Sequence, residues 1–185
     1  MIVYRVFPHL ASAPPGEPGH PLYEHYPQRG SRIDHPDYYV WYLSRFAEAA
    51  CGETFGNFAQ WAASMLQFPA LPGSRRALGV FSLPDDLRVL DLDDPMQLVR
   101  LGLRPTQVVV RNLPVTQAWG HRIWSEIDSH TGDHRWQAVS WWSYHRPVWT
   151  VLASWLRPEL VQVELLDMNH PALLEAAKAL QRKVI

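Results

Sequence analysis

A glutamate, Glu53, stands where the sequence otherwise predicts the apolar face of a helix. The helix is predicted for residues 45–66, with Ser44 as its N-cap, because apolar residues recur there at helical spacing. Burying an unpaired carboxylate is costly, so Glu53 requires a cationic or hydrogen-bonding partner. Arg32, in the loop before a tyrosine-rich strand, is the nearest candidate in the sequence.

Position alone allows two interpretations of Arg32 and Glu53. In the first, they form a structural ion pair, or Glu53 lies at the rim of the helix face. In the second, the helix face borders a pocket, and both charged groups act on a ligand there. The residue types and spacing do not decide between the two.

Other chemical motifs are absent from the sequence. There is no GxGxxG, GxxxxGK[ST], GxSxG or HExxH pattern. Cys51 points about 200° away from Glu53 on a helix of 3.6 residues per turn, so we expect a buried, inert thiol. The histidines match no standard metal-ligand spacing, and no metal is expected; the sets considered are His20 with His25 and His35, and His130 with His134.

Several short stretches resemble, in order, those of the RES-domain family, which is named for an arginine, a glutamate and a serine. The first are "GHPLY", "GSRIDHPDYYVWYLS" and "GETFG", and the later ones are "LRVLDLDDP", "TQAWGHRIW" and "WQAVSWWS". The resemblance covers about Tyr4 to Trp155. Residues 156–185 form a C-terminal strand-plus-helix extension in this interpretation, and residues 1–185 are expected to form a single domain.

The resemblance carries the family residues to four positions of this chain. Arg32 takes the place of the arginine, Glu53 of the glutamate and Ser143 of the serine. Tyr42 matches a tyrosine that lines the family's pocket. Two stretches depart from the pattern: Ile-Asp follows Arg32 where many members have an aromatic residue and Asn, and Ser143 is followed by Tyr-His-Arg.

The resemblance implies an enzyme that consumes NAD, with a mixed β core similar to that of ADP-ribosyltransferases. Members break the nicotinamide–ribose bond by hydrolysis, phosphorolysis or ADP-ribose transfer, and most are toxins neutralised by an Xre-type antitoxin. Arg32 would hold the pyrophosphate, and Glu53 would stabilise the positive charge that develops on the ribose. Tyr42 would stack on the nicotinamide, and Ser143 would hydrogen-bond to its amide or to the ribose.

Two other function classes stay open. The first is a catalytically idle member that binds its antitoxin or another protein. The second is a carbohydrate-binding module, suggested by the nine tryptophans. The acceptor of ADP-ribose and the oligomeric state, which includes a homo-oligomer, are also open.

Composition sets the broad class. The chain has 185 residues, enough for one domain with a sizeable core. Its 17 basic and 18 acidic residues give a formal net charge of -1, which does not favour a nucleic-acid or anionic-membrane partner. A single cysteine excludes an intrachain disulfide, and no signal peptide or apolar run of about 18 residues occurs. A cytoplasmic protein is expected.

The order of the predicted elements favours an α+β fold, because strands and helices mix without regular alternation. Residues 11–36 form a long loop in this prediction, and a turn falls at residues 130–133. Helices are predicted for residues 45–66, 95–101 and 116–127, and another begins at 169–171. The predicted strands cover residues 2–7, 38–43, 77–83, 87–92, 137–142, 148–155 and 161–165.

Overall fold

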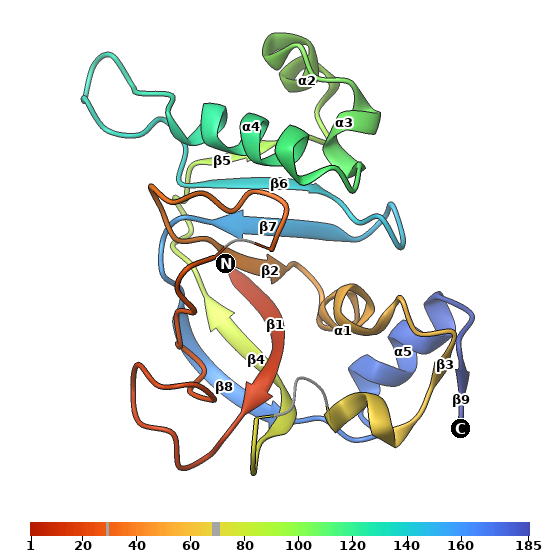
Figure 1. Cartoon of the computed structure of the whole chain (residues 1–185). Coiled ribbons are helices and arrows are strands. Elements are labelled where there is room, and N and C mark those ends of the chain that lie inside the picture. Colours follow the sequence, from red (N-terminus) through yellow and green to blue (C-terminus); the bar gives the residue numbers. More distant parts are fainter. Residues whose placement is uncertain (29, 68–70) are drawn as a thin grey trace.

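The structure is a computed structural model that describes residues 1–28, 30–67 and 71–185, and a mixed seven-stranded sheet forms its centre (Figure 1). The strand order is β5-β6-β7-β2-β1-β4-β8, and the pairs are antiparallel except β5 with β6. The strands are β1 (Ile2–His9), β2 (Trp41–Ser44), β4 (Arg75–Ser82), β5 (Val89–Asp91), β6 (Ala138–Trp142), β7 (Thr150–Ser154) and β8 (Glu159–Leu165).

The described helices pack in two groups beside this sheet. They are α1 (Ala47–Phe55), α2 (Pro95–Leu101), α3 (Pro105–Val109), α4 (Leu113–Trp124) and α5 (Pro171–Ala179), with a short 3-10 helix, η1 (Ala63–Gln67). A separate parallel ribbon joins β3 (Gln60–Trp61) to β9 (Lys183–Val184). The α+β class and the mixed sheet agree with the sequence-based prediction.

The two helix groups cover different parts of one face of the sheet. Alternate side chains of β7 separate its two faces: Val151 and Ala153 pack with α2, α3 and α4, whereas Leu152 packs in the cluster on the other face. Tyr4 and Val6 of β1 pack with α1 and α5. In Figure 1, α2, α3 and α4 lie by the β5–β6 end, and α1 and α5 lie beside β1. Part of the central sheet face lies between the two groups.

The helix around Glu53 differs from its prediction. It spans only Ala47–Phe55, and Ser44 belongs to β2, where it is paired with Val151. The predicted continuation to residue 66 is wrong because the chain leaves the helix at Gly56. The carbonyl of Gly56 accepts a hydrogen bond from Arg182 Nη2 at 2.9 Å, and the following residues reach β3 and η1 instead.

Two other helices show where local signals succeed and where they fail. The predicted helix at 95–101 is confirmed, with Asp94 accepting a hydrogen bond from the backbone N–H of Met96 at 2.9 Å. Helix α4 begins at Leu113 rather than near residue 116, because Asn112 is its N-cap. It ends at Trp124, so Ile127 lies outside it and is exposed, and α3 was not predicted at all.

The other predicted strands and turns have close counterparts. The seven predicted strands correspond to β1, β2, β4, β5, β6, β7 and β8, with ends shifted by up to a few residues. Residues 11–28 and 30–36 contain no regular helix or strand, as expected for the long loop. Across the described ranges, no helix is both long and apolar enough to cross a membrane.

Gly52 sets how closely α1 approaches the turn before β7. A Cβ at Gly52 would lie 2.2 Å from Cζ3 of the buried Trp149 ring. We expect Gly52→Ala to destabilise the fold by about 1–2 kcal/mol, because the overlap outweighs the gain in helix propensity. Urea unfolding measures this, with Gly30→Ala as control, since a Cβ there meets nothing within 4 Å. Equal stabilities of the two variants would contradict the close approach.

Candidate active site

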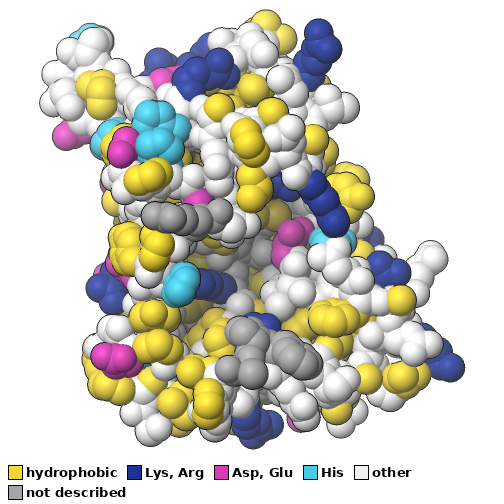
Figure 2. Space-filling model, viewed as in Figure 1, with side chains coloured by type: hydrophobic (Ala, Val, Ile, Leu, Met, Phe, Trp, Pro, Cys, Tyr) yellow, Lys and Arg dark blue, Asp and Glu magenta, His cyan; other side chains and the backbone are white. Residues whose placement is uncertain are grey.

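A cavity of about 370 Å³ opens on the part of the sheet face between the two helix groups. Its floor includes Tyr4 of β1, Tyr42 of β2 and Val151 of β7, and its walls include Arg32, Glu53 and Tyr144. Figure 2 shows a hollow near the centre of one face of the molecule, with basic and acidic side chains beside it. Three of the four sequence-predicted site residues, Arg32, Tyr42 and Glu53, therefore line one cavity.

Ser143, the fourth predicted residue, does not line the cavity but forms a hydrogen bond with Glu53. It follows β6, is buried, and its hydroxyl donates a hydrogen bond to Oε1 of Glu53. The same Ser143 Oγ accepts hydrogen bonds from the backbone N–H groups of His145 at 3.0 Å and Arg146 at 3.3 Å. Because those two donors occupy the oxygen's lone pairs, the hydroxyl proton is directed at the carboxylate.

The group that contacts the Glu53 carboxylate is the hydroxyl of Ser143 rather than Arg32. The Glu53 side chain is only half-buried, and its described hydrogen-bond partner is the hydroxyl of Ser143. The direct Arg32–Glu53 ion pair considered from the sequence is not formed in the described residues, where no N···O contact within 4.0 Å joins them. The arginine and the carboxylate instead lie on the same cavity without neutralising each other directly.

Arg32 is fixed by the backbone around the end of α3. Its Nη1 donates to the carbonyl oxygens of Val108 at 2.6 Å and Val110 at 2.9 Å. Burial lowers the pKa of Arg32, while the nearby charge of Glu53 opposes that shift. Within the described part of the chain, Nε and Nη2 of Arg32 have no acceptor. One edge of the guanidinium is thus anchored, and the other edge is available to an anion.

Tyr42 fixes the turn that carries Arg32. Its hydroxyl accepts the N–H of Ile33 at 2.9 Å and donates to Oδ1 of Asp34 at 2.8 Å. The other oxygen of Asp34 accepts the N–H of Ser31 at 2.7 Å. Burial raises the pKa of Tyr42, and the charge of Asp34 adds to the shift, so the phenol stays neutral and keeps its proton. Only the ring of Tyr42, with its hydroxyl engaged, can face a ligand.

Tyr144, which lines the cavity, and two residues near it were not assigned by sequence reasoning. The guanidinium carbon of Arg111 lies 4.8 Å from the centroid of the Tyr144 ring, and its Nη2 donates to Asn57 Oδ1 at 3.1 Å. His145 lies against Gly56, and burial lowers its pKa while the charge of Glu53 opposes the shift. The departure of residues 144–146 from the family pattern was a signal for two of these residues, whereas Arg111 has no local signal.

The expectation of a buried, inert thiol is confirmed, whereas the histidine sets considered from the sequence differ from the one that the structure brings together. Cys51 is a free, fully buried cysteine, and burial raises its pKa to about 12, so it is protonated at neutral pH. Among the described residues, His20 and His25 do not gather with His35 into a group able to hold a metal.

Comparison with known proteins identifies similarities of sequence and of fold. A family model described as the RES domain matches residues 2–179, a range that includes β8 and α5. No curated protein sequence matches the chain significantly. The fold is similar to a chain of the crystal structure of the M. tuberculosis MbcT–MbcA toxin–antitoxin complex, with a TM-score of 0.60 and 18% identity. The alignment covers 97% of this chain and 88% of the other, and at that identity it shows a shared fold alone.

The hydroxyl of Tyr42 yields a prediction about stability. Tyr42→Phe removes it and leaves Asp34 Oδ1 and the N–H of Ile33 without this partner. Since both atoms are shielded from water, we expect a loss of about 1–3 kcal/mol in the free energy of unfolding. Urea unfolding should detect it, and Tyr144→Phe is the control, because Tyr144 is 57% exposed. If both variants match the wild type, the hydrogen bonds of Tyr42 do not hold the turn.

Proposed function

The chain belongs to the RES domain family, as its motifs predict, and on that premise we propose that it consumes NAD by cleaving the nicotinamide–ribose bond. The observation that carries the proposal is the placement of Glu53. Its carboxylate is oriented by a buried hydroxyl and lines a cavity that also contains the guanidinium of Arg32. A fixed negative charge and a fixed positive charge therefore face one space.

The fixed carboxylate suits the charge changes of this reaction. Nicotinamide leaves NAD as a neutral molecule, so the bond breaks without strong acid assistance, and positive charge develops on the ribose. A carboxylate that is already oriented stabilises this charge without reorganising during the reaction. In the proposal, Glu53 faces the ribose, and Ser143 acts as a positioning residue through its hydrogen bond to Glu53. A direct contact of Ser143 with the substrate stays a prediction from the resemblance.

Arg32 would bind the pyrophosphate of NAD, and Tyr42 would contact its nicotinamide ring. The edge of the Arg32 guanidinium that has no acceptor among the described residues suits a pair of pyrophosphate oxygens. The ring of Tyr42 lines the floor of the cavity and offers a surface for the nicotinamide ring. A volume of about 370 Å³ lies within the range of small-molecule sites, roughly 300–1,000 Å³.

We further propose that the protein is a toxin held inactive by an antitoxin of the Xre type, in the cytoplasm. The similar fold in a toxin–antitoxin complex supports this setting. Because the cavity is open to solvent, a partner segment seated in it would exclude NAD. An idle protein-binding member of the family is the competing function, and it predicts no turnover by the free chain.

The charge of Glu53 supplies the first test. We expect the free chain to release nicotinamide from NAD, and Glu53→Gln to lower that rate at least 100-fold, as removal of a preorganised electrostatic group does. Glutamine keeps the shape and a hydrogen bond to Ser143 but loses the charge. Glu48→Gln is the matched control, because Glu48 lies on the same helix outside the cavity lining.

Chromatography of the products identifies the acceptor. ADP-ribose indicates hydrolysis, a phosphorylated ADP-ribose that requires added phosphate indicates phosphorolysis, and a modified protein indicates transfer. No nicotinamide from a folded, partner-free sample would overturn the enzymatic proposal and favour the idle binding protein.

The fork of Arg32 supplies a second test, measured without turnover. In the Glu53→Gln background, we expect Arg32→Lys to weaken NAD binding at least about tenfold, because an ammonium cannot form two parallel hydrogen bonds. Titration calorimetry measures the affinity, with Arg45→Lys as control, since Arg45 is exposed and outside the cavity lining. Unchanged affinity with Arg32→Lys would assign Arg32 a structural role through Val108 and Val110.

A further inference from the structure

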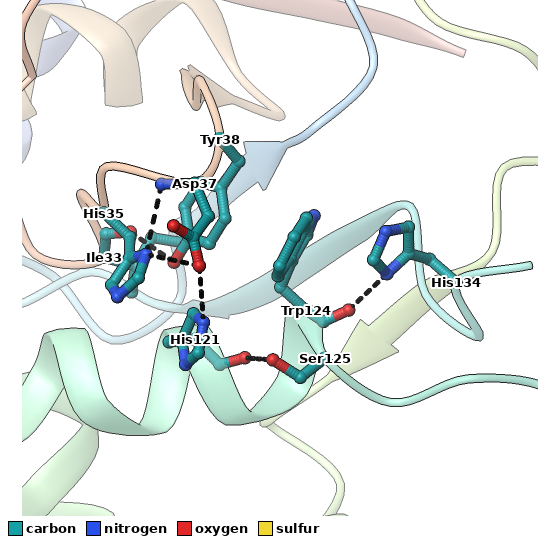
Figure 3. Close-up of polar contacts among 8 residues, drawn as sticks. All are labelled: Ile33, His35, Asp37, Tyr38, His121, Trp124, Ser125 and His134. Atoms are coloured by element: carbon teal, nitrogen blue, oxygen red, sulfur yellow. Dashed lines mark hydrogen bonds and ion pairs between the residues drawn. The ribbon is translucent and has the colours of Figure 1, made fainter.

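Two histidines and an aspartate gather outside the cavity lining, and two of them lie on the loop just after Arg32. Oδ2 of Asp37 lies 3.4 Å from Nδ1 of His35 and 3.2 Å from Nε2 of His121. The three ligand atoms all lie within 4.8 Å of one another. Figure 3 shows both imidazoles next to the Asp37 carboxylate, with His121 on α4 and the other two residues on the loop.

The hydrogen bonds of this cluster leave an electron pair facing a carboxylate. The backbone N–H of Asp37 donates to Nδ1 of His35 at 3.3 Å, so this nitrogen is the unprotonated one in that contact. The same nitrogen faces Oδ2 of Asp37 at 3.4 Å. Two atoms that both present lone pairs repel each other unless a proton or a metal ion lies between them. The third atom, Nε2 of His121, faces the same oxygen.

We propose that His35, Asp37 and His121 bind a divalent transition-metal ion of the Zn²⁺ type. Two imidazole nitrogens and one carboxylate oxygen are a donor set that such ions prefer. Tetrahedral bonds of about 2.0–2.1 Å place neighbouring ligand atoms roughly 3.4 Å apart. Both distances from Asp37 Oδ2 already match that value.

The pair of imidazoles must adjust to complete the site. The rings of His35 and His121 are stacked, with centroids 3.9 Å apart and planes 23° from parallel. An ion lies in the plane of each imidazole that binds it, so the two rings tilt toward each other on binding. Both side chains have room for this, because His35 is 29% and His121 37% exposed. The same exposure leaves the fourth position to water.

The ion would connect the Arg32 turn to α4. The loop and the helix already touch there: Gln117 Nε2 donates to the carbonyl of Ser31 at 3.2 Å, and a Cβ at Gly120 would lie 2.5 Å from Cβ of Ile33. A metal bridge between the loop residues and His121 adds a stronger connection at the same junction. Its binding stabilises the folded chain, because the unfolded chain does not assemble the three ligands. The proposal is independent of NAD cleavage.

Calorimetric titration of Zn²⁺ into tag-free, chelator-treated protein tests the site. We expect one ion bound per chain and an increase in Tm that depends on the Zn²⁺ concentration. His121→Ala should weaken the binding at least tenfold, and Asp37→Asn should weaken it with little change in shape. His130→Ala is the matched control, because His130 faces Asp128 at 3.6 Å on the surface and belongs to no described three-ligand group.

The outcomes separate a metal site from a simple protonated pair. Binding that survives both His121→Ala and Asp37→Asn, or that His130→Ala removes equally, overturns the proposal. No uptake of Zn²⁺, Ni²⁺ or Co²⁺ by the wild type also overturns it and leaves an imidazolium–carboxylate contact only. Circular dichroism checks that each variant is folded. If His121→Ala is not folded, the Zn²⁺ affinity of Asp37→Asn decides the test.

Discussion

The hydrogen bond from Ser143 to Glu53 joins the two parts of the structure on which the cavity depends. It links the end of β6, covered by one helix group, to α1 of the other group. The connection between β6 and β7 contacts the elements that carry both residues. The N–H of Ser143 donates to the carbonyl of Trp149 at 2.7 Å, and the Trp149 ring packs against α1 where Gly52 lacks a side chain. The orientation of one carboxylate is therefore built into the packing of α1 against the β6–β7 connection.

The cavity follows from an incomplete helical cover over one sheet face. The opposite face is closed by an apolar cluster that includes Val3, Trp41 and Leu152. On the cavity side, two clusters form separately over the two ends of the sheet and leave the short strand β2 between them. Tyr42 reaches this space from β2, and charged groups of the surrounding elements line it. A binding space arises here without the cost of burying unpaired charges in a closed core.

Local patterns in the sequence predicted what depends on nearby residues. The strands, the Asp94-capped helix and the buried Cys51 follow from periodicity, capping and burial, and the family resemblance directed attention to Arg32 and Glu53. Distant contacts were out of reach: the end of α1 depends on Arg182, and Arg32 is held by carbonyls beside an unpredicted helix. Likewise, Asp37 and His121 are 84 residues apart, so no spacing rule could have brought them together.

The last described residues, 182–185, hold the segment that follows the helix carrying Glu53. Arg182 donates to the carbonyl of Gly56, β9 pairs with β3, and the N–H of Ile185 donates to the carbonyl of Trp61 at 2.9 Å. For a protein whose proposed activity harms its own host, a genetic selection for survivors samples every way of disabling it. Such escape mutations should therefore include frameshifts and nonsense codons shortly before residues 182–185, far along the sequence from any residue proposed to meet the substrate.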